Sequence, residues 1–338
     1  MNAKALAERK QERPAMTDPS VSVLCLAYNH AAYIADALEG ILSQVTSFDC
    51  EVLIHDDASS DGTSEIISEY VSKYPGLITT ITQRSNVYSQ GIKPSSVLLP
   101  ISRGRYLAYC EGDDYWTDRF KLEKQVAFME SRPELSMSFH PALQILETPE
   151  SPMHVRNSRP PGDEIVSDRE VIVERGNFYP TVSAMFRRDA VSDHFLALAH
   201  LRVPGDHLLA VASVCAGKVG YISDCMAVFR RNRASITQSY KYNLDGQAKA
   251  ELLKRNAEDT LYAFEYIDKY TKSRFGRALA ESRRRYICGW MTTNIAMLRM
   301  GDAWRLNRMA YKYLSWPDYL NVVPRYLLKA LRLRWTSV

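Results

Sequence analysis

The sequence predicts an α/β fold in which helices flank a mostly parallel, twisted sheet and a helical region follows at the C-terminal end. Short apolar runs rich in β-branched residues alternate with segments whose apolar residues recur at helical spacing. Short polar loops separate these segments, and beyond about residue 244 the pattern is helical throughout. Such alternation is typical of a parallel sheet. With 338 residues, 46% of them apolar, the chain can bury one large core.

We expect three parts: a disordered N-terminal segment at 1–19, an α/β domain at 20–240 and a helical region at 241–338. The expected strands are Val21–Ala27, Glu51–Ile54, Leu77–Thr82, a run around Tyr106, Ser136–Leu146, Tyr179–Arg187, Val219–Ile222 and Met226–Arg230. The expected helices are Tyr33–Leu42, one beginning near Ile66, Ser95–Ser102, Phe120–Met129 and Leu208–Cys215. Between them, Thr148–Gly162 is rich in Pro, Ser and Arg, so we expect an exposed loop there.

Polar clusters directly follow three of the expected strands. They are Tyr28-Asn29, Asp56-Asp57 and the run from Glu111 to Asp114. In an open parallel sheet, ligands bind outside the carboxyl ends of the strands, near the point where the strand order reverses. The three clusters are therefore expected to converge on one edge of the sheet.

The run Glu111-Gly112-Asp113-Asp114 ends an apolar strand with three carboxylates and a glycine. Oxygen ligands packed this closely suit Mg²⁺ or Mn²⁺, because these cations share their remaining positions with water and substrate phosphates. The alternative is an acidic turn that caps the next helix, in which Asp118 would cap Arg119–Glu130. A cap explains one carboxylate and leaves three unexplained, so we favour a metal site.

Cysteine usage and the N-terminal residues predict a cytoplasmic location. None of the six cysteines forms a Cys-x-x-Cys pair, which suits core residues in a reducing compartment. The first seventeen residues are charged and lack the apolar stretch of a signal peptide. No apolar segment is long enough to span a bilayer.

Charge is distributed unevenly along the chain. From Lys269 to the end there are 15 Lys and Arg against 3 Asp and Glu, a net charge of +12, which leaves −8 for the rest. In the last helix, one face carries the apolar residues Leu320, Leu327, Leu328, Leu331 and Trp335, and another carries Arg325, Lys329 and Arg332. This pattern is typical of a helix on an anionic membrane surface. The alternative is a terminal helix that packs on its own core. Nucleic-acid binding is not expected, because the aromatic residues lie on apolar stripes.

Four motifs occur in order: VSVLCLAYNH, EVLIHDDASSDGT, GRYLAYCEGDDYW with its continuation TDRFKLEKQ, and GDHLLAVASVCAGKVGYISDCMAVFRR. Together they resemble glycosyltransferase family 2, a group of inverting enzymes of GT-A fold that use nucleotide sugars. The resemblance covers roughly residues 20 to 235.

The resemblance implies a site for a metal ion and a nucleotide. Negative charge develops on the departing diphosphate, so a divalent cation beside it lowers the barrier. Asp113 is the first expected ligand, with Glu111 and Asp114 close by. In the family the first acid of this motif is usually Asp and reaches the ribose or the metal, and this chain has Glu111 at that position.

Residues of the first motifs are expected to hold the nucleoside. Tyr28 would pack on the base, with Asn29 beside it, and Asp57 would accept from an imide N–H, a role that Asp56 could take instead. Arg84 would reach the base or the diphosphate, or be an ordinary surface arginine. We interpret Asp61-Gly62-Thr63 as a turn and cap.

Inversion needs a base that removes the proton of the acceptor hydroxyl. By resemblance, Asp206 takes this role, because it lies where the family's acidic motif begins a helix. The alternative is a helix N-cap. The neighbouring His207 is also a candidate, but it would point away from Asp206 in the first helical turn.

Arg230 lies where many family members have an Arg followed two residues later by a His that can bind the metal. Here that position is Asn232. Either the metal relies on carboxylates and phosphate alone, or this loop binds the diphosphate through Arg230, Arg231 and Arg233.

The function expected from the sequence is metal-dependent, inverting glycosyl transfer from a nucleotide sugar to a glycan or lipid-linked glycan acceptor, in cell-surface polysaccharide synthesis, with the tail at the inner face of the membrane. A nucleotidyltransferase would present a glycine-rich, lysine-bearing loop near its start, and VSVLCLAYNHAAY has none. The second candidate is a non-catalytic module of the same fold that binds a sugar nucleotide or a glycan.

Overall fold

The computed structural model describes residues 19–146, 153–160, 164–231 and 246–294, together with 311, 312, 316 and 319. The predictions for residues 1–18, for most of the last helix, for Asn232 and for part of the loop Thr148–Gly162 lie outside these residues. The described residues form two compact units. The first runs to Val171 and includes Arg175–His200 and the residues from Pro204 to 231, and the second holds Ile172–Glu174, Leu201–Val203 and the residues from 246 onward.

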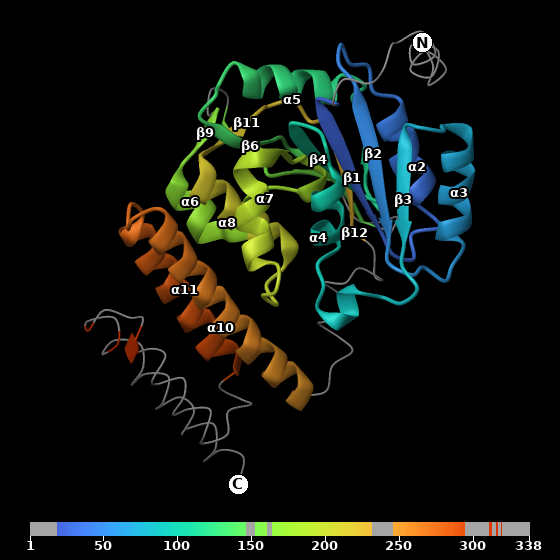
Figure 1. The fold of residues 1–338 in the computed structure, drawn as a ribbon. Helices are drawn as coiled ribbons and strands as arrows, with labels where there is room; N and C mark the ends of the chain where they lie inside the picture. Colours follow the sequence, from blue (N-terminus) through green and yellow to red (C-terminus); the bar gives the residue numbers. More distant parts are fainter. Residues whose placement is uncertain are drawn as a thin grey trace. The chain divides into compact units, whose positions relative to one another are not determined.

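The first unit is built on an eight-stranded sheet (Figure 1). In spatial order its strands are β3 (Ile78–Thr82), β2 (Cys50–Asp56), β1 (Val21–Ala27), β4 (Tyr106–Glu111), β10 (Met185–Arg187), β6 (Leu135–Phe139), β11 (Lys218–Tyr221) and β9 (Ile165–Val166). The pairs among β1–β4 are parallel, and β10 and β9 are antiparallel to their neighbours. The predicted α/β class with a mostly parallel sheet is confirmed.

The strand order reverses between β1 and β4. The chain builds outward from β1 through β2 to β3, and then returns to the other side of β1 with β4. Val21–Ala27 can occupy the centre because every residue except the half-buried Leu26 is buried, as expected where both faces of a sheet are covered. The carboxyl ends of β1 and β4 therefore border the crevice in which such sheets bind ligands.

A second sheet of four strands completes the unit. Its order is β5 (Tyr115–Trp116), β12 (Ala227–Arg231), β7 (Ala142–Leu146) and β8 (His154–Arg156). Because β12 pairs with β5, directly after the acidic run, this sheet brings residues from the end of the domain to the candidate site.

Helices flank the main sheet. They are α2 (Ile34–Leu42), α3 (Thr63–Lys73), α4 (Pro94–Leu98), α5 (Lys121–Glu130), α6 (Asp168–Glu174), α7 (Arg188–Leu198) and α8 (Gly205–Ala216). Figure 1 shows α3 beside β3, and α8 contacts β6 and β11. Gly40 lets α2 approach β5, because a Cβ there would lie 2.8 Å from the carbonyl oxygen of Trp116.

Two predicted strands differ from the structure. Ser136–Leu146 divides into β6 and β7, which belong to different sheets, because the chain turns at His140-Pro141 and proline has no N–H for a ladder. Only the last three residues of Tyr179–Arg187 form a strand. Thr181–Ser183 instead makes a short 3₁₀ turn before β10.

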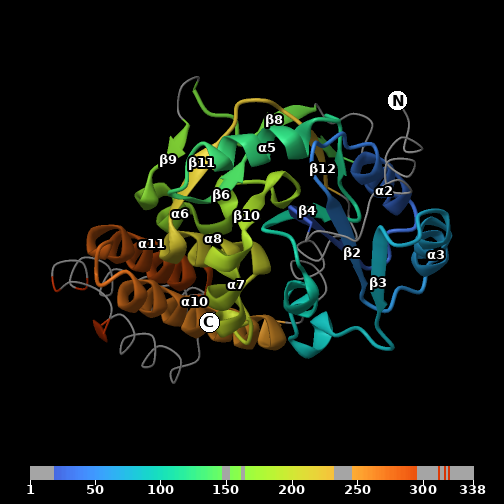
Figure 2. The same cartoon turned by 45° about the horizontal axis from the view of Figure 1, so that its top comes forward.

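In the second unit, the described residues 246–294 form two helices joined by a turn. Its two long helices, α10 (Gly246–Tyr270) and α11 (Gly276–Asn294), lie side by side in both views (Figure 2). The turn between them contains Lys272 and Ser273 at positive φ. Among the helices that the structure describes, none has the length and apolar content needed to cross a bilayer.

Candidate active site

The acidic run begins as the last residue of β4 and turns at once. The N–H of Gly112 extends the ladder to β1 by donating to the carbonyl of Leu26 (2.8 Å), and the N–H of Asp114 donates back to the carbonyl of Glu111 (3.0 Å). A Cβ on Gly112 would lie 2.8 Å from Nδ1 of His30. A larger residue at this turn would have to displace the side chains of His30 and Ile34, so glycine allows the turn to lie close to them.

The carboxyl groups of this turn influence one another and Asp206. Burial, and next the negative charges of Asp113 and Asp206, raise the pKa of Glu111 to about 8. Burial, and next Asp113 and Glu111, raise the pKa of Asp114 well above its usual value. Residues predicted from distant motifs thus lie close enough to interact electrostatically.

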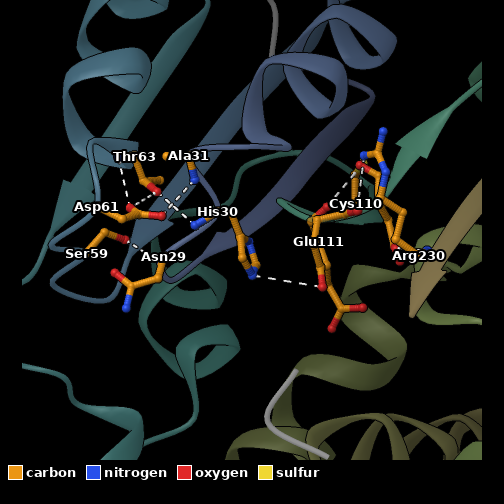
Figure 3. A network of polar contacts seen from close by, with 11 residues as sticks. Asn29, His30, Ala31, Ser59, Asp61, Thr63, Cys110, Glu111 and Arg230 are labelled. Atoms are coloured by element: carbon orange, nitrogen blue, oxygen red, sulfur yellow. Dashed lines mark hydrogen bonds and ion pairs between the residues drawn. The ribbon is translucent and has the colours of Figure 1, made fainter. Parts of the chain in front are cut away.

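His30 is a site residue that the sequence interpretation missed. Its Nε2 lies 4.0 Å from Oδ2 of Asp113, and its buried Nδ1 has no hydrogen-bond partner among the described residues. Figure 3 shows its ring directed toward the Glu111 side of the site. Burial lowers the pKa of His30, against the charges of Asp113 and Asp61. Its signals in the sequence were its place close to a strand end and at the end of the motif VSVLCLAYNH.

The loops that follow β1 and β2 are joined at the predicted nucleoside side. Asn29, with a φ of 54°, donates its backbone N–H to Oγ of Ser59 (2.9 Å) and accepts at Oδ1 from the N–H of Ser60 (2.9 Å) (Figure 3). Tyr28 is 39% exposed beside them. Asn29 thus shapes the loop, while the Tyr28 ring is available to a ligand.

Asp61 and Thr63 tie the same loops together (Figure 3). The carboxylate of Asp61 accepts from the N–H of Ala31 (3.0 Å) and from the N–H and hydroxyl of Thr63 (3.1 and 2.6 Å). The Thr63 hydroxyl in turn accepts from the N–H of His30 (2.8 Å). These contacts match the turn chemistry expected of Asp61.

Asp56 and Asp57 are both buried but have different partners. The carboxylate of Asp56 accepts from the backbone N–H and hydroxyl of Ser59 and from the hydroxyl of Ser64, so it organises its own loop. Asp56 is 0% exposed, and Asp57 is 2% exposed.

The two oxygens of Asp57 reach across to the loop after β3. They accept from the backbone N–H groups of Val87 (2.6 Å) and Tyr88 (3.1 Å). Each carboxylate oxygen can accept more than one hydrogen bond, so Asp57 keeps capacity for a ligand N–H. Arg84, at the start of this loop, is exposed.

Asp206 lies in the first turn of α8 without acting as its N-cap. The helix begins at Gly205 and its N-cap is Pro204. Oδ1 of Asp206 accepts from the adjacent N–H of His207 (2.7 Å), whereas a cap bonds to an N–H two or three residues on. The hydroxyl of Tyr179 donates to its backbone carbonyl (2.8 Å). Asp206 is thus held by Tyr179 and not engaged as a cap.

Two positively charged side chains influence the carboxyl group of Asp206. Burial raises the pKa of this carboxyl, while Arg156 and Lys93 are among the groups that lower it. Arg156 belongs to β8, within the segment predicted to be an exposed loop, and its guanidinium lies 4.9 Å from the ring centroid of Phe229. Lys93 precedes α4 and is 6% exposed. No local motif distinguished either residue in the sequence.

Arg230 lies on β12 beside the acidic turn (Figure 3). Its backbone N–H donates to Oδ1 of Asp114 (2.7 Å) and its Nη1 donates to the carbonyl of Asp113 (3.2 Å). Oδ2 of Asp114 is buried and has no hydrogen-bond partner within the described part of the chain. Arg231 is exposed, and Arg233 lies outside the described residues.

No ready-made metal cage is present in the part of the chain that the structure describes. There, no three His, Cys, Asp or Glu side chains are grouped so that they could hold an ion. Asp118, the capping alternative, accepts from the N–H of Phe120 (2.8 Å) at the start of α5 and from Nζ of Lys124 (2.7 Å). The N-cap of α5 is Phe120 and no side chain caps this helix, so Asp118 bonds to the turn before α5 and does not act as its cap.

The sheet, its switch point and the solved structures define a GT-A glycosyltransferase fold. The crystal structure of S. aureus TarS 1–349 in complex with UDP matches 91% of this chain and 82% of its own, with a TM-score of 0.57 and 17% identity. The TarS complex with UDP-GlcNAc matches 92% of each chain, with a TM-score of 0.55 and 15% identity. The family model described as glycosyl transferase family 2 matches residues 22–195, more than half of the chain. The chain belongs to this family.

Relatives support the same family. An uncharacterized protein of Mycobacterium tuberculosis is 37% identical over 222 residues, which are 65% of this chain and 61% of that protein. The chain thus spans less than two thirds of that relative's length. The putative teichuronic acid biosynthesis glycosyltransferase TuaG of Bacillus subtilis is 36% identical over 114 residues, which are 34% of this chain and 43% of TuaG.

Proposed function

We propose that the protein transfers a sugar, with inversion and with a divalent metal ion, from a nucleoside-diphosphate sugar to a glycan or lipid-linked glycan acceptor in cell-surface polysaccharide synthesis. The observation that carries the proposal is the electrostatic interaction of Glu111, at the end of β4, with Asp113 in the turn that follows and with Asp206 on α8. Family membership and the nucleotide complexes of TarS support the donor. The name of TuaG supports a role in polysaccharide synthesis.

Mn²⁺ or Mg²⁺ is the proposed cofactor. These ions commonly bind through one or two carboxylates together with substrate phosphates, so they do not need an all-protein cage. Asp113 and Glu111 fit this use, because their mutual repulsion favours a cation. Asp114, predicted as a third ligand, is 1% exposed and already bonded to Arg230. When bound, the ion would stabilise the charge on the departing diphosphate.

Asp206 is the proposed base. Burial raises its pKa, and a carboxylate with a raised pKa accepts a proton more readily. If it takes the proton of the acceptor hydroxyl on the face opposite the diphosphate, the sugar is attacked with inversion. Tyr179 fixes the backbone at Asp206 through its carbonyl, which holds the start of α8 in place.

The donor nucleoside is proposed to lie where β1 and β2 end. The exposed ring of Tyr28 can pack on the base, and Asp57 can accept from it while holding the loop after β3. Asn29 and Asp56 would support the shape of these loops. Arg84 is proposed to reach the diphosphate from its exposed position.

The decisive experiment measures donor binding and transfer separately. Release of nucleoside diphosphate is followed over a panel of sugar nucleotides with Mn²⁺, with Mg²⁺ and with a chelator. Asp206→Asn should abolish transfer and leave donor binding intact, and equal loss of both would contradict its role as base. The matched control is Asp189→Asn, a change of an 80% exposed carboxylate in the first turn of α7. Donor binding without diphosphate release, whatever the acceptor, would favour a non-catalytic binding module.

Peripheral attachment to an anionic membrane stays a prediction from the C-terminal charge. The last helix predicted from the sequence lies outside the described residues. Deletion of the residues from Trp316 onward should move the protein from the membrane fraction to the soluble fraction. An unchanged distribution would refute this attachment.

A further inference from the structure

We propose that Arg230 is a positioning residue that fixes the acidic turn, and that Asp36 on α2 acts on the site through it. This inference rests on the proposed function. It gives Arg230 a different role from the diphosphate contact predicted from the sequence, and it assigns a role to an exposed carboxylate that no motif singled out.

Arg230 is bonded to the acidic turn at two adjacent residues. Its backbone N–H donates to the carboxylate of Asp114, and its guanidinium donates to the backbone carbonyl of Asp113. The first bond orients a buried side chain, and the second restrains the peptide that sets the direction of the Asp113 carboxylate. The two bonds therefore restrain the turn between β4 and β5.

The guanidinium itself lies close to two aromatic rings. It lies 4.5 Å from the ring centroid of Tyr115 and 5.2 Å from that of Tyr33, and the Arg230 side chain is only 15% exposed. Stacking on aromatic faces and a forked set of donors are properties of arginine that lysine lacks. The rings restrict the guanidinium to the position from which it reaches Asp113.

Asp36 supplies the remaining restraint. Its Oδ2 accepts from Nη2 of Arg230, and its own side chain is 58% exposed in the first turn of α2. The two residues are 194 positions apart in the chain. Because Asp36 is bonded to the guanidinium of Arg230, loss of its charge should affect the acids through that guanidinium.

If Arg230 and Asp36 hold the acidic turn in position, both divalent-ion binding and kcat should depend on them. Displacement of a reacting or charge-stabilising group by about 1 Å can cost about a hundredfold in rate. Loosening of the turn should therefore weaken divalent-ion binding and lower kcat. It should leave the nucleoside pocket around Tyr28 and Asp57 unaffected.

The experiment compares the full-length chain with Asp36→Asn, Arg230→Gln, the double variant and the control Glu69→Gln, which changes an exposed carboxylate paired with Lys73 in α3. Hydrogen exchange of the backbone amides at 112–116 reports on the turn without any substrate. We expect about tenfold faster exchange in Asp36→Asn, a larger increase in Arg230→Gln, no further increase in the double variant and no change in the control.

Binding measurements separate positioning from direct contact. Affinity for Mn²⁺ alone should fall in Asp36→Asn and Arg230→Gln, while the ratio of nucleoside-diphosphate to nucleoside-monophosphate affinity without metal should stay constant. A fall of that ratio in Arg230→Gln alone would show a direct diphosphate contact and overturn the inference. Wild-type exchange in Asp36→Asn, which lies on the surface and should fold, would also overturn it. Absence of diphosphate release from the wild type would contradict only the proposed function, because exchange tests the turn independently.

Discussion

The carboxylate of Asp206 lies directly against the backbone of Gly176. A Cβ added to Gly176 would stand 2.7 Å from both Cγ and Oδ2 of Asp206. This distance is too short for a contact, and the atoms opposite belong to the end of a short side chain that can rotate. Gly176 therefore leaves the space that the proposed base occupies.

Gly176→Ala should displace the Asp206 carboxylate with little effect on the fold. We expect kcat to fall about tenfold to a hundredfold while donor affinity is retained, because only the proton-accepting group moves. Gly205→Ala is the control, since a Cβ there meets no atom within 4 Å although the residue adjoins Asp206. Steady-state kinetics and donor titration of both variants check this, and equal activity of the two would count against the proposed base.

Asp57 is expected to serve both the loop after β3 and the nucleotide. Asp57→Asn replaces one oxygen that accepts from Val87 or Tyr88 by an NH₂ group, which opposes a backbone donor. The free energy of unfolding should fall by about 1–3 kcal/mol, and affinity for nucleoside diphosphate should fall about tenfold or more. Denaturant unfolding and calorimetric titration measure both quantities. Retained affinity in a destabilised variant would limit Asp57 to a structural role, and the exposed Glu65→Gln in α3 is the control.

The first half of the fold was predictable because its signals are local. Val21–Ala27 is an apolar run buried on both faces, and the polar residues after it mark the strand end. Ser136–Leu146 looks like one strand because its break at His140-Pro141 depends on which sheet each half joins. The division depends on pairing with strands that are distant in the sequence, and the local sequence pattern does not indicate this pairing.

The same distinction applies to the candidate site. Glu111, Asp113 and Asp206 could be proposed because acids at strand and helix ends form motifs. The contact of His30 with Asp113 requires the turn at Gly112, and that of Arg230 with Asp36 joins two ends of the domain. The packing of elements far apart in sequence determines such contacts, so they could not be predicted without the structure.

Lys121 is fully buried in the core of the first unit. Its Nζ donates to Oε1 of Gln125 (2.6 Å) and lies 4.2 Å from the ring centroid of Trp116. Burial lowers the pKa of Lys121 to about 7. Between pH 7 and about 10.5 the unfolded chain therefore binds more protons at this lysine than the folded chain does.

The contribution of Lys121 to the free energy of unfolding should therefore rise with pH across this window and fall as pH decreases toward 7. Relative to Lys121→Met, wild-type unfolding free energy should increase by on the order of 1–4 kcal/mol from pH 7 to pH 10. Lys124→Met should keep the wild-type slope between pH 7 and about 9, where Lys124 is charged in both the folded and the unfolded chain. In the folded chain Lys124 donates hydrogen bonds to Asp118 and Asp224, which raise its pKa. Urea unfolding at several pH values tests this, and parallel curves for wild type and Lys121→Met would disprove the lowered pKa.

Glu51 joins three segments near the amino ends of the central strands, at the opposite end from the candidate site. Its Oε1 accepts from the hydroxyl of Ser22 (2.6 Å) and the N–H of Arg103 (2.7 Å), and its Oε2 accepts from Nε and Nη2 of Arg103 (2.9 and 2.8 Å). Burial alone would raise the pKa of Glu51, but the hydrogen bonds from Ser22 and Arg103 outweigh it and lower this pKa. The interaction therefore stabilises the fold above the pKa of the unfolded residue.

Glu51→Gln should lower the free energy of unfolding by about 1–3 kcal/mol at neutral pH, because the amide cannot accept all four hydrogen bonds. The difference from wild type should shrink as pH falls below about 4.5 and the wild-type carboxylate is protonated. Glu130→Gln removes an Arg–Glu pair whose side chains are both more than half exposed, so it should cost less than about 1 kcal/mol. Unfolding at pH 7 and pH 4 measures these differences. Activity per folded molecule should not change, and a loss of kcat in Glu51→Gln would mean that the amino ends of the strands influence the site.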